Sequence, residues 1–291
     1  MRRSLSLFIF SAPAVILVGI FCYIFAGWNT FISLMDWRES IISPYKFVGL
    51  FNYEELFSDS LFIKSLTNNL LLALAFTITT IALGLIMAIT IDYTKKPFKS
   101  FLQVIYLLPF SLSFVVSATL WMWMFAPSNG AINTILSILG LDQLRQPWIT
   151  SPHQSLFCVF IVYVWQFSGY AGLIYYAGIC GIKKEILEAA DIDGATGLQK
   201  YMYVIIPMLK NETLSITTIL LFYAFRVFDL VYVLTGGGPA LSSEVLATYM
   251  FRLAFNQNLF SYAAAIGSFS FFLSALVMIP LIYYSRRGMQ R

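Results

Sequence analysis

Long apolar stretches, separated by short polar joints, make up most of this chain. A membrane-spanning helix needs about 20 consecutive apolar residues, and transmembrane barrel strands are much shorter. The pattern therefore predicts an all-α, polytopic membrane protein with six transmembrane helices. The six predicted spans lie near Leu7–Leu34, Leu66–Ile91, Phe101–Phe125, Leu156–Cys180, Leu214–Leu234 and Phe260–Tyr284.

The composition supports a lipid environment. Apolar residues make up 59% of the 291 residues and charged residues only 11%, whereas roughly a quarter of a soluble domain is charged. The 27 phenylalanines and 17 tyrosines are too many for one soluble core of this size. We expect one membrane domain over residues 1–291, with no separate soluble module.

The lysines and arginines are unevenly shared between the two sides of the predicted membrane domain. Twelve lie at the two ends of the chain and in the joints after spans two and four, against five on the other side. Cytoplasmic segments carry the excess, so both termini and the joint at about 181–211 are expected in the cytoplasm. Because these basic residues border spans, their positive charge does not require a nucleic-acid partner. The first apolar stretch exceeds a signal-peptide core; we expect an uncleaved anchor, with a cleaved signal as the alternative.

Several residue types that often mark chemistry give no site in this chain. Cys22, Cys158 and Cys180 lack metal-ligand spacing, and His153 has no acidic or cysteine neighbours. The glycine-rich run 235–239 lacks the Lys-Ser or Lys-Thr of a phosphate-binding loop. We therefore expect no metal, no cofactor and no ATPase site in this chain, which makes it a non-enzyme.

The polar joint after span four has an ordered pattern of its own. Residues 184–193 favour a helix, and its small alanines allow another surface to approach closely. Gly194 can end that helix because glycine accepts a left-handed backbone. A second short helix is expected from Leu198 towards Ile206, with a break at Pro207. The spacing alone is more typical of an ordinary interfacial helix between spans.

The same joint resembles the EAA loop of permease subunits in ATP-driven (ABC-type) importers. Glu188, Ala189, Ala190 and Gly194 match the EAA-x3-Gly pattern, and Val204–Pro207 fills its last part with apolar exchanges. The FVGL-x-NY run from Phe47 and the LTGGGP run from Leu234 resemble carbohydrate-importer permeases. The resemblance covers most of the chain from about Phe47 onward.

The resemblance implies a type I ABC importer permease fold and a transport role in the cell membrane of a prokaryote. In that family the loop docks on the ATP-hydrolysing subunit, so Glu188, Ala189, Ala190 and Gly194 become the expected ATPase-coupling positions. The implied partners are two ATP-hydrolysing subunits that bind ATP and Mg²⁺, a sister permease, an extracytoplasmic substrate-binding protein and the lipid bilayer. The implied substrate is a sugar or sugar-like solute.

Polar residues within spans four and five are candidates for the substrate path. Gln166 and Tyr170 share one face of span four; Tyr223, Arg226 and Asp229 fall three apart along span five, so one helical stripe can present all three. Charges at this depth are costly and usually paired or functional. An internal Arg226–Asp229 ion pair is the structural alternative to substrate contact.

Rival functions remain open at the level of sequence. An ion-coupled secondary transporter would explain the charges in span five but leaves the EAA-like loop without a purpose, and a non-transporting scaffold would need only that loop. Maltose-type permeases carry asparagines where this chain has Ala224, Arg226 and Val227. The solute is therefore not identified, and a polyol or glycerol phosphate stays an alternative to a sugar.

Overall fold

The structure is a computed structural model that describes residues 12–38 and 46–288, with the backbone alone for residues 285–288. The chain divides into two compact units. Unit 1 comprises Met1–Ile63 and Tyr249–Leu273, and unit 2 comprises Lys64–Thr248 and Ser274–Arg291. Helices account for nearly all of the ordered elements, as the sequence predicts.

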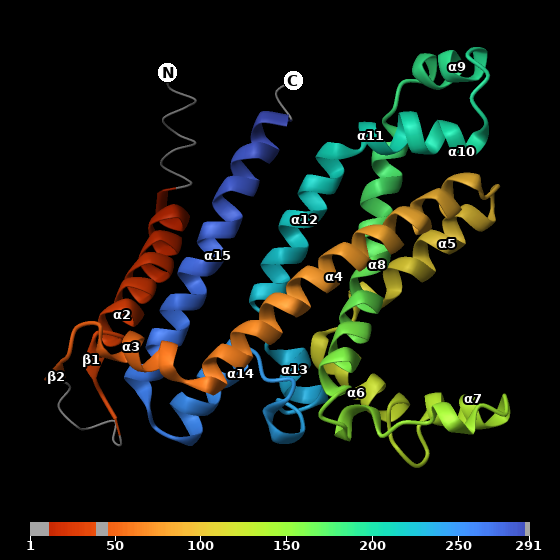
Figure 1. Cartoon of the computed structure of the whole chain (residues 1–291). Coiled ribbons are helices and arrows are strands. Elements are labelled where there is room, and N and C mark those ends of the chain that lie inside the picture. The colour runs from red at the N-terminus through yellow and green to blue at the C-terminus, as the bar shows by residue number, and fades with distance from the viewer. Residues whose placement is uncertain (1–11, 39–45, 289–291) are drawn as a thin grey trace, which may run out of the picture. The chain divides into compact units, whose positions relative to one another are not determined.

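The elements follow one another with short connections (Figure 1). In the first part of the chain they are η1 (Ile20–Ile24), α2 (Phe25–Ile32), β1 (Met35–Asp36), β2 (Lys46–Phe47), α3 (Phe51–Ser58), α4 (Ser60–Tyr93), α5 (Phe98–Leu107), η2 (Leu108–Ser111), α6 (Phe114–Met124), α7 (Ala131–Ile138), η3 (Asp142–Leu144), η4 (Trp148–Thr150) and α8 (Ser155–Cys180). The second part contains α9 (Lys184–Ile192), α10 (Gly197–Lys200), η5 (Tyr201–Ile205), α11 (Ile206–Met208), α12 (Lys210–Phe225), α13 (Asp229–Leu234), η6 (Pro239–Leu241), α14 (Leu246–Phe251), η7 (Arg252–Asn256) and α15 (Phe260–Gly288).

Among the described residues, four helices are each long and apolar enough to cross a membrane. They are Ala12–Ile32, Ser60–Tyr93, Ser155–Cys180 and Phe260–Tyr284. Two bent helix pairs bring the total to six when each pair is counted as one span. Each of the six predicted spans overlaps one of these, although the fifth, Leu214–Leu234, shares only the Lys210–Phe225 part of its bent pair and continues into α13. The predicted start of the first span, at Leu7, lies outside the described residues.

The third predicted span is not one straight helix. Phe98–Ser111 and Phe114–Met124 meet at an angle of 97°. Leu112 is extended, and the Ser113 hydroxyl accepts a hydrogen bond from the backbone N–H of Val116 at 3.3 Å, which caps α6. Serine at this position supplies a partner for a backbone donor that the start of a helix leaves free. The sequence pattern alone does not predict this break.

The fifth predicted span is also broken, which corrects the expectation of one continuous helical stripe. Arg226 ends α12 and Asp229 begins α13, with Phe228 outside helical geometry (φ −131°, ψ −66°). At the break the Ala224 carbonyl accepts a long hydrogen bond of 3.5 Å from the Val227 N–H, and a second one at 3.0 Å from the buried side-chain amide of Asn69 on α4. A buried backbone group needs such a partner, so Asn69 makes the interruption energetically acceptable.

Unit 1 is held together by side chains that bond to backbone. The Asn29 amide donates to the Ala264 carbonyl at 3.0 Å, which joins α2 to α15. The fully buried Asn52 of α3 donates to the carbonyls of Ser33 and Met35 at 2.8 and 2.7 Å. These bonds fix α3 against the small antiparallel β1–β2 ladder, in which Met35 faces Phe47.

A cluster of charges lies next to that ladder. Arg38 pairs with Glu55 at 2.6 Å and with Asp36 at 3.0 Å. The Glu55 carboxylate accepts a hydrogen bond from Arg38, and this raises the pKa of the guanidinium. Asp59 accepts hydrogen bonds from the hydroxyls of Tyr249 and Tyr262, which ties the start of α4 to α14 and α15 within unit 1.

Unit 2 is built around α8. The apolar part of α8 is 61% buried, against 33% for that of Ser60–Tyr93, which lies almost wholly in the same unit, so α8 is the more central of these two long helices. Close approach needs small residues: a Cβ on Gly169 would lie 1.6 Å from the Tyr106 carbonyl oxygen of α5. Within unit 2, α9 and α10 gather at one end, and α7 and α13 lie at the opposite end (Figure 1).

Candidate functional site

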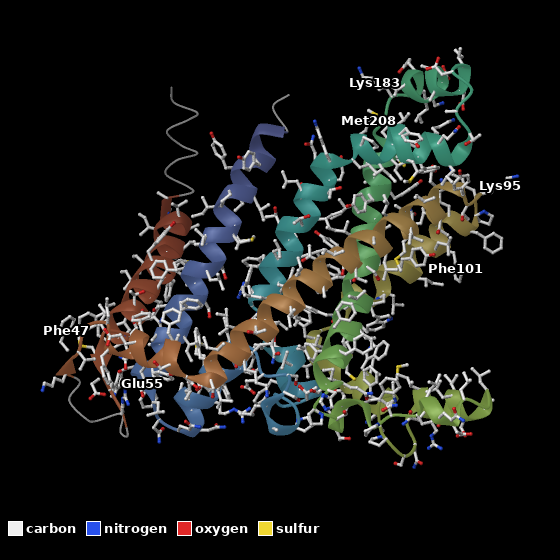
Figure 2. All side chains as sticks on the ribbon, viewed as in Figure 1. Phe47, Glu55, Lys95, Phe101, Lys183 and Met208 are labelled. Carbon is white, nitrogen blue, oxygen red and sulfur yellow. The ribbon has the colours of Figure 1, made fainter. Side chains whose placement is uncertain are left out.

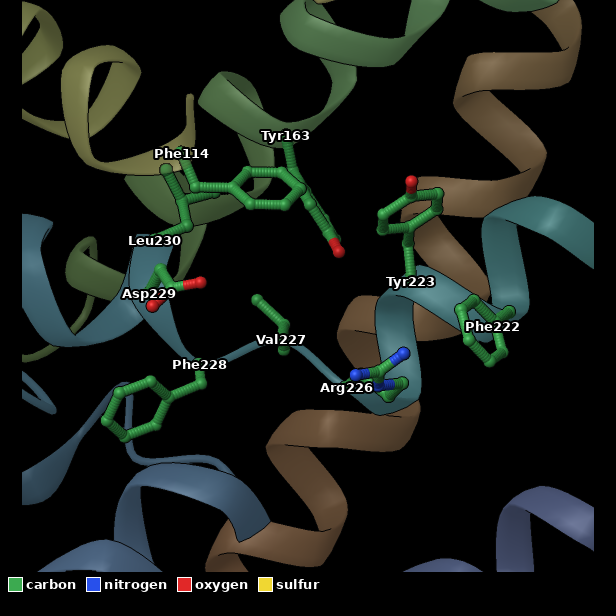
Figure 3. Close-up of a pocket in the computed structure, with 9 residues that line it drawn as sticks. All are labelled: Phe114, Tyr163, Phe222, Tyr223, Arg226, Val227, Phe228, Asp229 and Leu230. Atoms are coloured by element: carbon green, nitrogen blue, oxygen red, sulfur yellow. The ribbon is translucent and has the colours of Figure 1, made fainter. Parts of the chain in front are cut away.

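Two regions of unit 2 contain the predicted functional residues. The first is the coupling segment, residues 181–211, in which Lys183 and Met208 are labelled in Figure 2. The second is a cavity between α6, α8 and the broken span formed by α12 and α13 (Figure 3).

The coupling segment has the two-helix form that the sequence predicts. Gly194 has φ +76° and ends α9, while the Ala195 N–H donates to the Ala190 carbonyl at 3.0 Å across the turn. The second helix begins with a capping box, in which Thr196 and Gln199 each bond the other's backbone. The bend of 64° before α12 falls at Leu209, two residues after the predicted break at Pro207.

The four predicted coupling residues do not all face outward. Glu188, Ala189 and Gly194 are exposed, whereas Ala190 is only 8% exposed. Ala190 closes the turn through its carbonyl and packs inside the segment, so its geometry favours a structural role over direct docking. The reason is its position on α9, where it is the side chain that turns towards the body of the segment.

Sequence reasoning missed the large apolar side chains that the coupling segment exposes. Ile192 is 87% exposed, Leu198 74% and Tyr203 78%, and Met202 adds to the same segment at 56%. Single exposed apolar residues are common, but four large ones within residues 192–203 of a polar joint make this segment a candidate interaction surface. The signal was present in the sequence, since these residues interrupt an otherwise polar joint.

The cavity is formed from two neighbouring recesses. The first has about 480 Å³ of space and is lined by Phe114, Tyr163, Phe222, Tyr223, Arg226, Val227, Phe228, Asp229 and Leu230. The second has about 830 Å³ and is lined by Phe110, Leu112, Ser113, Phe114, Val115, Gln166, Phe167, Tyr223 and Asp229. Phe114, Tyr223 and Asp229 line both recesses, which makes the two spaces neighbours.

Four of the five predicted path residues reach these recesses, although span five is broken. Tyr223, Arg226 and Asp229 line the first recess, and Gln166, Tyr223 and Asp229 line the second. Tyr170 lines neither of them. Its ring stacks on Phe110 with the two centroids 4.4 Å apart, so it supports the wall of the second recess.

Gln166 is fixed by the break in span three. Its side-chain amide donates to the Leu112 carbonyl at 2.8 Å, and the residue is 2% exposed. Its Oε1 atom is buried without a hydrogen-bond partner within the described chain. A buried amide oxygen of this kind retains its capacity to accept a hydrogen bond.

The two charges of span five do not pair with each other. Among residues 12–38 and 46–288, no ion pair joins Arg226 to Asp229. The Arg226 guanidinium instead lies 4.9 Å from the centre of the Phe222 ring. The structural alternative, an internal ion pair, is therefore wrong for this conformation. Because the helix breaks between them, the two residues do not share the helical face that would bring them together.

Tyr163 is a cavity residue that the sequence analysis did not select. It is 1% exposed, its ring stacks on Phe76 with centroids 4.2 Å apart, and its hydroxyl points into the cavity (Figure 3). It precedes Gln166 by three positions and Tyr170 by seven, so the helical period placed all three on one face. That period was the signal that could have identified it.

Together the cavity offers aromatic walls and several kinds of polar group. Tyr163 and Tyr223 contribute hydroxyls, Arg226 contributes hydrogen-bond donors, and Asp229 contributes acceptors. Aromatic walls with a few polar groups are typical of small-molecule sites. The arrangement suits a hydroxyl-rich solute with one or more apolar faces.

Comparison with known proteins gives concordant matches. The family model described as "Binding-protein-dependent transport system inner membrane component" matches residues 80–290. The chain is 45% identical to a probable ABC transporter permease protein of Pyrococcus horikoshii, with 100% of each chain covered. It is 36% identical to the xylose/arabinose import permease protein XacH of Haloferax volcanii, over 95% of this chain and 88% of that one.

A solved structure shares the fold. It is that of a bacterial alginate ABC transporter in complex with an alginate pentasaccharide-bound periplasmic protein. The TM-score is 0.85, the sequences are 24% identical, and the alignment covers 98% of this chain and 96% of that one.

Proposed function

We propose that this chain, which belongs to the family of binding-protein-dependent transport system inner membrane components, forms the translocation path for a sugar in an ATP-driven importer. The chain is a multi-pass membrane protein and a permease subunit of the ABC type. The expected family and the expected permease fold are both confirmed by the match over residues 80–290 and by the alginate-transporter structure.

The observation that carries the proposal is the pairing of two features in unit 2. An exposed coupling segment lies at one end, and an aromatic cavity with convergent polar groups lies between the broken spans. A secondary transporter acting alone has no use for the first feature, and a scaffold has none for the second. An importer permease uses both, because energy supplied at the segment has to change access to the cavity.

A sugar is the solute class that the cavity chemistry favours. Tyrosine and phenylalanine rings offer flat faces for the C–H surfaces of a sugar ring, and Arg226 and Asp229 offer donors and acceptors for its hydroxyls. The similarity to XacH, whose name gives xylose and arabinose as its solutes, supports the same class. Since Arg226 forms no ion pair with Asp229, an anionic solute such as glycerol phosphate is the second candidate.

The partners follow from the family and from the coupling segment. Two ATP-hydrolysing subunits bind ATP and Mg²⁺ and contact the segment through Glu188, Ala189, Gly194, Ile192 and Leu198. A sister permease completes the path, and an extracytoplasmic binding protein delivers the solute. The permease itself hydrolyses no ATP.

The orientation follows from the basic residues. In unit 2, the end with the coupling segment also holds the joint between α4 and α5 with the start of α5 (Figure 1). Together these two stretches contain Lys95, Lys96, Lys99, Lys183, Lys184, Lys200 and Lys210, of which Lys95 and Lys183 are labelled in Figure 2. Cytoplasmic joints attract lysine and arginine, so this end faces the cytoplasm. The end with α7 and α13 then faces outward, towards the binding protein.

Reconstitution tests the proposal directly. The permease is purified with its ATP-hydrolysing partners and binding protein in proteoliposomes, and uptake of radiolabelled xylose, arabinose and glycerol 3-phosphate is measured with ATP or a non-hydrolysable analogue. We expect sugar uptake that requires ATP hydrolysis and the binding protein. Uptake without ATP that collapses with an ionophore would favour the ion-coupled alternative. ATP-driven uptake of glycerol 3-phosphate alone would replace the sugar with the anion.

A further inference from the structure

The coupling segment is attached to α4 through a contact between two residues far apart in sequence. The Tyr201 hydroxyl donates a hydrogen bond to the Asp92 carboxylate, although the two residues are 109 positions apart. Tyr201 is only 7% exposed, and its ring lies 5.4 Å from that of Tyr93. The contact is therefore shielded by packing on the side of the segment.

Asp92 lies at an electrostatically unfavourable position, which suggests a role other than local stability. It lies in the last turn of α4 (Ser60–Tyr93), where a negative charge opposes the helix dipole. The structure offsets that cost with Tyr201 and with Lys99 of α5, whose Nζ atom is 3.9 Å from the carboxylate. Lys99 in turn lies 5.1 Å from the centre of the Tyr176 ring on α8. One carboxylate thus connects the segment to the ends of three helices.

Contacts within the coupling segment connect α9 to Tyr201. Lys200 forms an ion pair with Asp191, which ties α9 to α10 across the Gly194 turn. Tyr201 begins the π-helical stretch η5 (Tyr201–Ile205), a rare form that is frequent at functional sites. A Cβ on Gly197 would lie 2.9 Å from the Tyr93 hydroxyl, so the segment approaches α4 closely.

We propose that the Asp92–Tyr201 contact is a mechanical link that makes α4 follow the coupling segment during the ATP cycle. Asp92 and Tyr201 act as positioning residues, since neither touches solute or nucleotide in this role. Without the link, the segment moves with the ATP-hydrolysing partner while α4 stays behind. The inference rests on the proposed function, because it needs a partner that pushes on the segment.

Distance measurements between spin labels test the link. Labels are placed at Glu185→Cys on α9 and Ile86→Cys on α4, both at exposed positions, in a chain whose Cys22, Cys158 and Cys180 are replaced. The assembled complex is measured without nucleotide and after trapping with ATP and vanadate. In the chain that keeps Asp92 and Tyr201, we expect the distance between the two labels to be the same before and after trapping. In Tyr201→Phe we expect that distance to change by about 2 Å or more on trapping.

Three further variants separate the link from general damage. Asp92→Asn keeps a hydrogen-bond acceptor and should retain the constant distance, whereas Asp92→Ala should shift as Tyr201→Phe does. Tyr106→Phe removes a tyrosine hydroxyl from α5, outside the coupling segment, and should behave like the unmodified chain. Asp92→Ala also serves in place of Tyr201→Phe if that variant does not assemble.

Different outcomes would contradict the proposed link and the proposed importer function. A distance that changes on trapping in the unmodified chain, or that stays constant in both Tyr201→Phe and Asp92→Ala, overturns the link. A complex that assembles but cannot be trapped by ATP and vanadate at all contradicts the proposed function instead.

Discussion

The side-chain amide of Asn69 donates a hydrogen bond to the carbonyl oxygen of Ala224 at 3.0 Å, at the point where α12 ends and the cavity opens. Asn69 is fully buried on α4. Its neighbour Asn68 bonds the carbonyls of Ser242 and Glu244 at 3.0 and 2.8 Å, beyond the other end of α13. Two adjacent asparagines therefore fix both approaches to the short helix that presents Asp229.

The first prediction concerns this bond. Asn69→Ala leaves the buried Ala224 carbonyl with the long hydrogen bond from the Val227 N–H and without its shorter one, and should lower the free energy of unfolding by about 1 kcal/mol. Thermal unfolding of the purified permease in detergent measures the change. Asn129→Ala, in an exposed loop, is the matched control and should have little effect. Equal melting behaviour of the two variants would contradict the role of Asn69.

The second prediction concerns the turn of the coupling segment. Gly194 has φ +76°, and a Cβ added there would meet no neighbouring atom within 4 Å, so backbone strain alone should decide which side chains it accepts. Gly194→Val should weaken co-purification of the ATP-hydrolysing subunit, whereas Gly194→Asn should retain most of it, because asparagine tolerates the left-handed region. Pull-down yield compares the two, and an equal loss in both would point to steric exclusion at the interface.

The third prediction concerns the exposed apolar surface of the segment. Ile192→Glu introduces a charge where an apolar side chain is 87% exposed. We expect weaker binding of the ATP-hydrolysing subunit by about tenfold, which corresponds to about 1.4 kcal/mol, with the fold of the permease intact. Ile138→Glu, on the equally apolar surface of α7 at the other end of unit 2, should leave that affinity unchanged. If both variants bind the partner normally, Ile192 is not at the interface.

The fourth prediction concerns the charges of the cavity. Because no ion pair joins Arg226 to Asp229 in the described part of the chain, loss of one charge should not relieve the loss of the other, and the double variant Arg226→Gln with Asp229→Asn should take up sugar less well than either single variant. A double-mutant cycle on the apparent affinity for the solute measures this. Rescue of either single variant by the charge-exchanged pair Arg226→Asp with Asp229→Arg would reinstate the ion pair.

The fifth prediction concerns orientation. In a chain without its native cysteines, Ser128→Cys should react with a membrane-impermeant maleimide added outside intact cells, and Gln199→Cys should react only after the cells are opened. Both residues are exposed in unit 2, and they lie in the joint before α7 and in the coupling segment. The reverse pattern would place the segment outside the cell.

The sequence predicted those parts of the fold that depend on regular patterns. Apolar length identified the spans, and the turn at Gly194 followed from the one residue type that adopts φ +76° without strain. The breaks at Leu112 and at Arg226–Phe228 were missed because they depend on partners elsewhere. The Ser113 cap is local, but the Ala224 carbonyl is satisfied by Asn69, 155 positions away.

The candidate site was also predicted only in part from the sequence. Gln166, Tyr223, Arg226 and Asp229 were selected as polar residues in apolar stretches, and they do line the recesses. Tyr170 was selected by the same rule but stacks on Phe110. The helical period does not show whether a side chain lines a cavity or packs behind the residues that line it, because that depends on where the neighbouring helix bends.

The exposed apolar side chains of the coupling segment also bear on how the subunit is made. If the ATP-hydrolysing partner docks on the coupling segment as proposed, a chain inserted in the membrane without that partner displays Ile192, Leu198 and Tyr203 to water. Such surfaces favour aggregation and invite proteases. Synthesis of the partner at the same time would cover these side chains. The amount of permease that escapes degradation should therefore depend on the amount of partner in the cell.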